Sequence, residues 1–189
     1  MKKIFLGLLF CTVSQIGIAQ NSIPTLKNNT ELHFVCKLHG QTRTLSLKTN
    51  LENDGVTFKL ETRGVKSSIV TTKEGLKNGT ALSYNQGEYA PVLNLKPTET
   101  FFMISQSAYQ ELIKNKKFVY NNTTYDLIAE DSQTAVFLDG ELVETFRIKA
   151  QIDETEMWIV KNPEFPLICK IAKNPLGINW TLVKVVDKS

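Results

Sequence analysis

The sequence predicts a mainly β fold, a curved antiparallel sheet or half-open β-barrel with one short helix packed on or inside it. Apolar and polar residues alternate in most segments between residues 31 and 186, as in strands with one buried face. Turn signals such as Asn53-Asp54-Gly55 and Asp139-Gly140 recur at short intervals. Short connections require antiparallel neighbours, and only one segment has helical periodicity.

The length of 189 residues suits a single domain, predicted over residues 31–189, after a signal peptide (1–19) and a flexible segment (20–30). The net charge is +3, and Lys2 and Lys3 contribute two of these charges, which leaves +1 without them. The chain has no basic cluster long enough to follow a phosphate backbone, so we expect no nucleic-acid partner.

The first 19 residues have the features of a secretory signal peptide. Lys2 and Lys3 precede the apolar run Ile4–Val13, and Gly17-Ile18-Ala19 offers a cleavage site before Gln20. The apolar run is too short to span a bilayer, and no later run is longer, so we predict a periplasmic or secreted protein without a transmembrane segment.

Lipid anchoring through Cys11 is a second interpretation of the same segment. Leu8 suits a lipidation site, but Phe10 stands where a small residue is required. We therefore predict that the mature chain is not anchored through Cys11.

The strands of the first half are marked by alternation between turn residues. They are predicted at Glu31–Leu38, Thr42–Thr49, Val56–Glu61, Val65–Lys73, Thr80–Tyr84 and Pro91–Leu95. Gly75 and Asn78-Gly79 are interpreted as a turn.

The one predicted helix covers about ten residues. Ser107 and Gln110 have capping-box spacing, although the helix could also start at Ser105. Tyr109 and Leu112 begin an apolar stripe. The negative end of the helix dipole favours positive charge, which is supplied by Lys114, Lys116 and Lys117.

The second half returns to strands and ends in a meander that we take as the scaffold of the sheet. The strands are predicted at Lys117–Tyr120, Thr124–Ala129, Thr134–Leu138, Leu142–Ala150, Met157–Val160, Leu167–Ile171 and Trp180–Val186. We expect residues two apart along these strands to share one core.

Cys36 and Cys169 remain after removal of the signal peptide, and both fall on apolar strand faces. A disulfide between them and two separate buried thiols are the alternatives. His33, Cys36 and His39 have spacing that suggests a metal site. On a strand, however, Cys36 points away from the two histidines, so we predict no metal site.

The chain lacks G-x-S-x-G, H-E-x-x-H and G-x-x-x-x-G-K, and we identify no catalytic residue and no cofactor. The candidate ligand-binding residues are Trp158, Trp180, Phe101 and Tyr109. Tryptophan in a strand is usually part of the core, and the alternative is an aromatic floor for a ligand.

Two stretches, ETFFMISQSAYQELIKNKKFVYNNTTYDL and EMWIVKNPEFPLICKIAKNPLGINWTLVKV, resemble uncharacterised secreted bacterial proteins. These are similar to the unclosed β-barrels of periplasmic lipoprotein carriers and outer-membrane lipoprotein receptors. The resemblance implies a curved sheet that half-wraps a helical element and shelters an apolar cleft.

Three functional hypotheses follow. The first is a non-enzymatic envelope or secreted protein that binds an apolar or lipid-like ligand, or an envelope component, in its concave face. The second is a structural or protein-interaction module without a small-molecule pocket. The third is a secreted hydrolase whose carboxylates come from distant positions.

Overall fold

The computed structural model describes residues 21–52, 55–62, 64–84, 91–129, 131 and 133–187. These residues form two helices and sixteen strands. The strands of the first half are β1 (Asn21–Ser22), β2 (Glu31–Leu38), β3 (Gln41–Glu52), β4 (Gly55–Thr62), β5 (Val65–Thr71), β6 (Ala81–Leu82), β7 (Val92–Asn94) and β8 (Glu99–Thr100). The others are β9 (Lys117–Tyr120), β10 (Thr123–Leu127), β11 (Phe137–Leu138), β12 (Glu141–Val143), β13 (Thr145–Ala150), β14 (Glu156–Val160), β15 (Ile168–Ala172) and β16 (Ile178–Val186).

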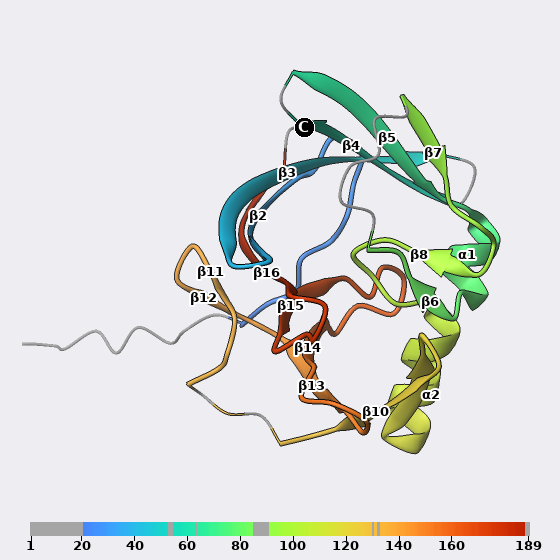
Figure 1. Ribbon diagram of the computed structural model, residues 1–189, viewed down its shortest axis with the longest axis vertical. Helices are drawn as coiled ribbons and strands as arrows, with labels where there is room; N and C mark the ends of the chain where they lie inside the picture. The colour runs from blue at the N-terminus through green and yellow to red at the C-terminus, as the bar shows by residue number, and fades with distance from the viewer. Residues whose placement is uncertain are drawn as a thin grey trace, which may run out of the picture.

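Eleven of these strands form one sheet, in the order β7-β5-β4-β3-β2-β16-β15-β14-β13-β10-β9. The sheet curves strongly around the interior but is not closed, so β7 and β9 are its edges (Figure 1). The last strand, β16, lies between β15 and β2 and joins the C-terminal meander to the N-terminal strands. The predicted mainly β, half-open architecture is therefore confirmed.

Three strand pairs are parallel, which corrects the expectation of antiparallel neighbours throughout. β5 pairs with β7, β6 with β8, and β1 with β12 in parallel. The partners in each pair are separated by other elements, and a crossover of that kind permits parallel pairing.

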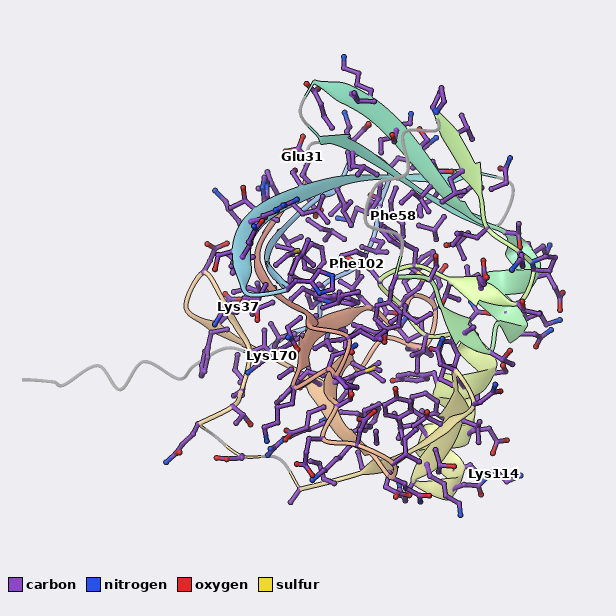
Figure 2. The ribbon with its side chains drawn as sticks, in the orientation of Figure 1. Glu31, Lys37, Phe58, Phe102, Lys114 and Lys170 are labelled. Carbon is purple, nitrogen blue, oxygen red and sulfur yellow. The ribbon has the colours of Figure 1, made fainter. Side chains whose placement is uncertain are left out.

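The buried apolar side chains form a single cluster that includes the interior of the curved sheet. Phe34 of β2, Phe58 of β4 and Trp180 of β16 belong to this cluster, and Phe146 of β13 packs against it partly buried. Figure 2 shows Phe58 and Phe102 inside the curve of the strands. The expected period-two burial into one shared core is confirmed.

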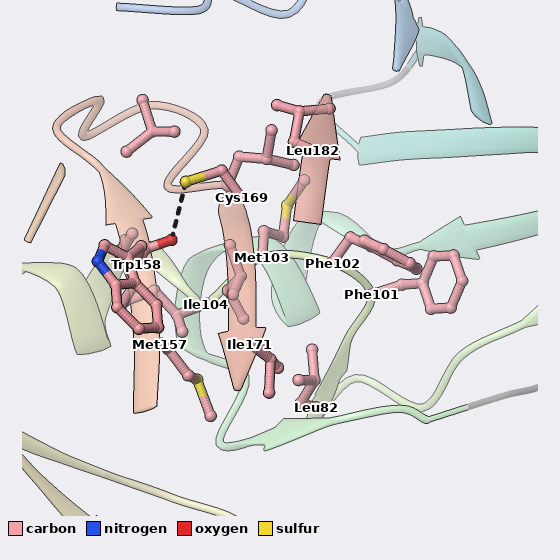
Figure 3. Packing of buried hydrophobic residues seen from close by; sticks show 14 of the residues in the cluster. Leu82, Phe101, Phe102, Met103, Ile104, Met157, Trp158, Cys169, Ile171 and Leu182 are labelled. Carbon is pink, nitrogen blue, oxygen red and sulfur yellow. Dashed lines mark hydrogen bonds between the residues drawn. The ribbon is translucent and has the colours of Figure 1, made fainter. Parts of the chain in front are cut away.

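The segment that follows β8 runs through the interior. Phe101, Phe102, Met103 and Ile104 all have exposed fractions of 5% or less. Backbone hydrogen bonds hold the segment to the start of β15: Ile104 N donates to Pro166 O at 3.2 Å, and Ile168 N donates to Phe102 O at 2.8 Å. The chain therefore occupies much of its own concave side (Figure 3).

The predicted helix is α2, Gln106–Asn115, and it packs against the core through Ala108, Tyr109 and Leu112. Its N-cap is Ser105, whose Oγ accepts a hydrogen bond from Ala108 N at 3.3 Å. The earlier of the two predicted starts is correct, and Ser107 lies within the first turn instead of capping it.

A second helix, α1 (Lys73–Asn78), lies where a strand end and a turn were predicted. Thr72 caps it, and Gly75 lets it approach β8 closely. A Cβ atom at Gly75 would lie 2.6 Å from Glu99 O, so the glycine that suggested a turn serves close packing.

The predicted strand Leu142–Ala150 is divided at Glu144. Its first part, β12, pairs with β11 and β1 in a small separate sheet, while β13 stays in the main sheet. The segment predicted to be flexible lies against the domain, since Leu26 is 5% exposed and Thr30 is fully buried. Residues 1–20, and with them Cys11, lie outside the described residues.

Candidate functional site on the convex face

Two of the predicted ligand-binding residues lie in the interior as parts of one aromatic cluster. The Phe102 ring lies 4.7 Å from Phe101 and 4.4 Å from Trp180, between ring centroids. Trp180 Nε1 donates to Ile168 O at 2.9 Å, which satisfies the only polar group of the indole. These contacts describe a packed core.

The other two predicted residues lie elsewhere. Tyr109 of α2 faces Phe146, with ring centroids 5.8 Å apart, and is 3% exposed. Trp158 of β14 alternates with Met157 and Ile159, which point into the core, so its indole lies on the convex side of the sheet. The four predicted residues therefore do not surround one common cavity.

Trp158 is the centre of a row of side chains on the convex face. The strand register places it directly opposite Arg147 of β13 and Lys170 of β15. The Lys170 ammonium lies 4.2 Å from the centroid of the indole, and the Arg147 guanidinium lies 5.5 Å from it. Both distances are in the range of cation–π attraction. Lys170 Nζ also donates to Thr134 O at 3.1 Å.

A buried carboxylate balances part of this positive charge. Glu156, with a side chain 5% exposed, accepts from Arg147 at 2.7 Å and from Lys173 at 2.7 Å. Burial by itself would raise the pKa of Glu156, but the hydrogen bonds from Lys173 and Arg147 outweigh it and lower the pKa below its ordinary value. Burial also lowers the pKa of Lys170, and Arg147 acts in the same direction.

Next to this row, a groove of about 540 Å³ runs over β2, β16 and β15. We call it the convex groove. Its lining residues are Val35, Lys37, Lys170, Ile171, Ala172, Lys173, Asn179, Trp180, Thr181 and Val183. Its volume is within the range of small-molecule sites. Figure 2 shows Lys37 and Lys170 on the outer side of the curved strands.

The strand pairing explains how the groove is assembled. Val35 is opposite Thr181, and Thr181 is opposite Lys170, so three strands contribute to one row. The pairing between β16 and β2 shifts register after Leu182, and Val183 at this bulge is 44% exposed. Bulges redirect side chains, and this one adds an apolar side chain to the groove.

Both cysteines that the structure describes are free and buried. Cys36 is opposite Trp180, and Trp180 is opposite Ile171, so β16 separates the two cysteine strands. Two strand spacings place the Cα atoms roughly 10 Å apart or more, beyond the reach of a disulfide. The geometry thus favours two separate thiols over the bridge. Cys169 Sγ donates to Trp158 O at 3.2 Å (Figure 3).

His33 and Cys36 lie on opposite faces of β2, with His33 Nε2 3.7 Å from Glu31 Oε2 and Cys36 buried in the core. Within the described ranges, no three His, Cys, Asp or Glu side chains gather as metal ligands. None of the helices in the described part of the chain has the length and apolar character needed to cross a membrane.

Sequence reasoning did not single out Lys37, Lys170 or Lys173. Alternation places Lys37 and Lys170 on outward faces, so part of the signal was present. The missing information was that β2 lies beside β16, which no local pattern specifies.

Comparison of the chain with models of known protein families, with curated proteins and with solved structures finds no match in any of the three.

Proposed function

We propose that this chain is a secreted, non-enzymatic binding protein whose ligand site is the convex groove. One observation carries the proposal: the concave side is filled by the chain itself, whereas the convex side is hollowed. Phe101 to Ile104 are nearly inaccessible, and the groove combines exposed cationic side chains with apolar ones. The signal-like features of residues 1–19 support secretion.

The expected binding of an apolar ligand in the concave face competes with this proposal. A ligand there would have to displace packed aromatic rings, such as Phe102 against Trp180 at 4.4 Å. Removing a large side chain from an interior packed in this way lowers the free energy of unfolding by several kcal/mol. A site on the convex face needs no such rearrangement, which is why we favour it.

The proposal can be tested by NMR mapping with a panel of neutral sugars, short acidic peptides, alkanols and alkanoates. We expect at least one compound to perturb the backbone signals of Val35, Lys37 and Thr181, while the signals of Met103 and Ile104 stay in place. Perturbation of the interior signals alone, or no perturbation by any compound, would overturn the proposal.

A pair of threonine variants makes the mapping specific to the groove. Thr181→Gln places a longer side chain in the groove and should weaken any binding seen there. Thr57→Gln makes the same change on β4, on an outward position away from the groove. Equal effects of the two variants would mean that the compound binds outside the groove.

Secretion is tested separately, by expressing the full chain in a Gram-negative host. We expect a periplasmic product that begins at Gln20, and a Lys2→Glu, Lys3→Glu double variant should be exported less efficiently. A cytoplasmic product that still carries residues 1–19 would contradict the secretion part of the proposal.

A further inference from the structure

The charge of the convex groove is one-sided. Lys37, Lys170 and Lys173 line it, and no carboxylate is among its lining residues. Lys173 is paired with Glu156, but the lining of the groove carries only cationic side chains, and a cationic surface favours a negatively charged ligand.

The ammonium groups retain free donors. Among the described residues Lys37 has no acidic side chain within ion-pair distance, and it is exposed. Lys173 contacts Glu156, but its side chain is 58% exposed. An ammonium has three donors, so Lys173, beside its contact with Glu156, and Lys170, beside its hydrogen bond to Thr134 O, can each donate to a further oxygen.

The remaining surface of the groove is mostly apolar. Val35, Ala172 and Val183 come from three neighbouring strands. Val183 is 44% exposed, and a ligand that covers its apolar surface removes that surface from water, which favours binding. A small inorganic anion would leave these side chains uncovered.

We propose that the ligand of the convex groove is a small amphipathic anion, with one carboxylate head and an unbranched alkyl tail. The head lies among the ammonium groups of Lys37, Lys170 and Lys173, and the tail covers Val35, Ala172 and Val183. This inference rests on the proposed function, since it names the ligand class of the same groove. Acidic peptides, which share the charge but lack the tail, are the competing class.

The experiment is isothermal titration calorimetry with decanoate, below its critical micelle concentration, on the chain from Gln20. Decanol serves as the neutral analogue, acetate as the head alone, and tetraglutamate as the acidic peptide. We expect measurable binding of decanoate only, with affinity that falls as salt is added because the ion pairs are exposed. NMR signals of Val35 and Thr181 should shift with decanoate.

Two matched pairs of exposed substitutions locate the head and the tail. Lys37→Gln should weaken decanoate binding about tenfold, whereas Lys59→Gln, an exposed lysine of β4 outside the groove, should have no effect. Val183→Ser should weaken it about fivefold, whereas Val65→Ser, at a valine 38% exposed in β5, should not. Circular dichroism confirms that each variant is folded.

The outcomes separate the two proposals. Equal binding of decanol and decanoate, tighter binding of tetraglutamate, or decanoate shifts confined to Phe102 and its neighbours would overturn the ligand assignment. If decanoate fails while another compound of the NMR panel perturbs the groove, the assignment falls and the proposed function stands. If no compound perturbs the groove, both fall.

Discussion

The ammonium of Lys170 lies 4.2 Å from the ring centroid of Trp158 and donates a hydrogen bond to Thr134 O. One side chain thus connects β15, the indole of Trp158 in β14 and Thr134 in the segment before β11. Lys170 also lines the convex groove, so a ligand that contacts Lys170 there would change the surroundings of Trp158 as well.

We predict that the environment of Trp158 follows the charge of Lys170. Burial lowers the pKa of Lys170, so in alkaline solution it should lose its proton below the ordinary lysine value and weaken the cation–π contact. In ¹⁹F NMR of protein labelled with 5-fluorotryptophan, the Trp158 signal should shift with this transition. Lys170→Gln should abolish the shift, and Lys184→Gln, an exposed change on β16, should leave it intact.

The sequence predicts the local parts of this architecture well and the long-range parts poorly. The bounds of β2 are predicted correctly because one of its faces is buried along its length, which makes the period of two visible. Helix α1 is missed because Gly75 and Gly79 resemble turn residues, while their role is close contact with Glu99 and Thr100.

The candidate site has the same limit. The alternation along β2 and β15 places Lys37 and Lys170 on outward faces, yet only the pairing of β16 with β2 brings them to one groove. Trp158 is predicted as a ligand contact because it is aromatic, but its partners Arg147 and Lys170 depend on the register of β13, β14 and β15. Such register follows from the whole core, not from any one segment.

A second prediction concerns acid stability. The folded pKa of Glu156 is lowered by its partners, so the unfolded chain binds more protons in acid. The stabilisation from Glu156 is therefore complete above its unfolded pKa, near 4.5, and is lost as the pH falls through the folded pKa. Urea denaturation as a function of pH should show this loss.

Glu156→Gln should remove this part of the pH dependence and should cost about 3 kcal/mol at neutral pH, because Arg147 loses a buried partner. Glu164→Gln, at an exposed carboxylate in the turn before β15, is the matched control and should keep the pH dependence. Parallel curves for Glu156→Gln and the unmodified protein would contradict the prediction.

A third prediction concerns a buried hydroxyl. Thr71, at the end of β5, is fully buried, and its Oγ1 has no hydrogen-bond partner among the described residues. A buried hydroxyl without a partner costs free energy. Thr71→Val keeps the shape and should raise the free energy of unfolding by about 1 kcal/mol.

Thr49 offers the matched comparison. It is 1% exposed, and its Oγ1 donates hydrogen bonds to Lys27 O and, at 3.1 Å, to Thr30 O. Thr49→Val should therefore lower the free energy of unfolding by about 1 kcal/mol. Chemical denaturation measures both variants, and the same sign for both would show that the two hydroxyls have equivalent surroundings.

The last prediction decides between the bridge and the separate thiols. With β16 between their strands, Cys36 and Cys169 should both be free. Burial raises the pKa of Cys36 to about 11 and that of Cys169 to about 12, so both thiols should be nearly unreactive in the folded protein. A thiol reagent should label two groups per chain starting at Gln20 under denaturing, non-reducing conditions, and close to none under native conditions. Cys36→Ser should reduce the denatured count to one, whereas a bridge between the two cysteines would give no labelling of the unmodified chain before reduction.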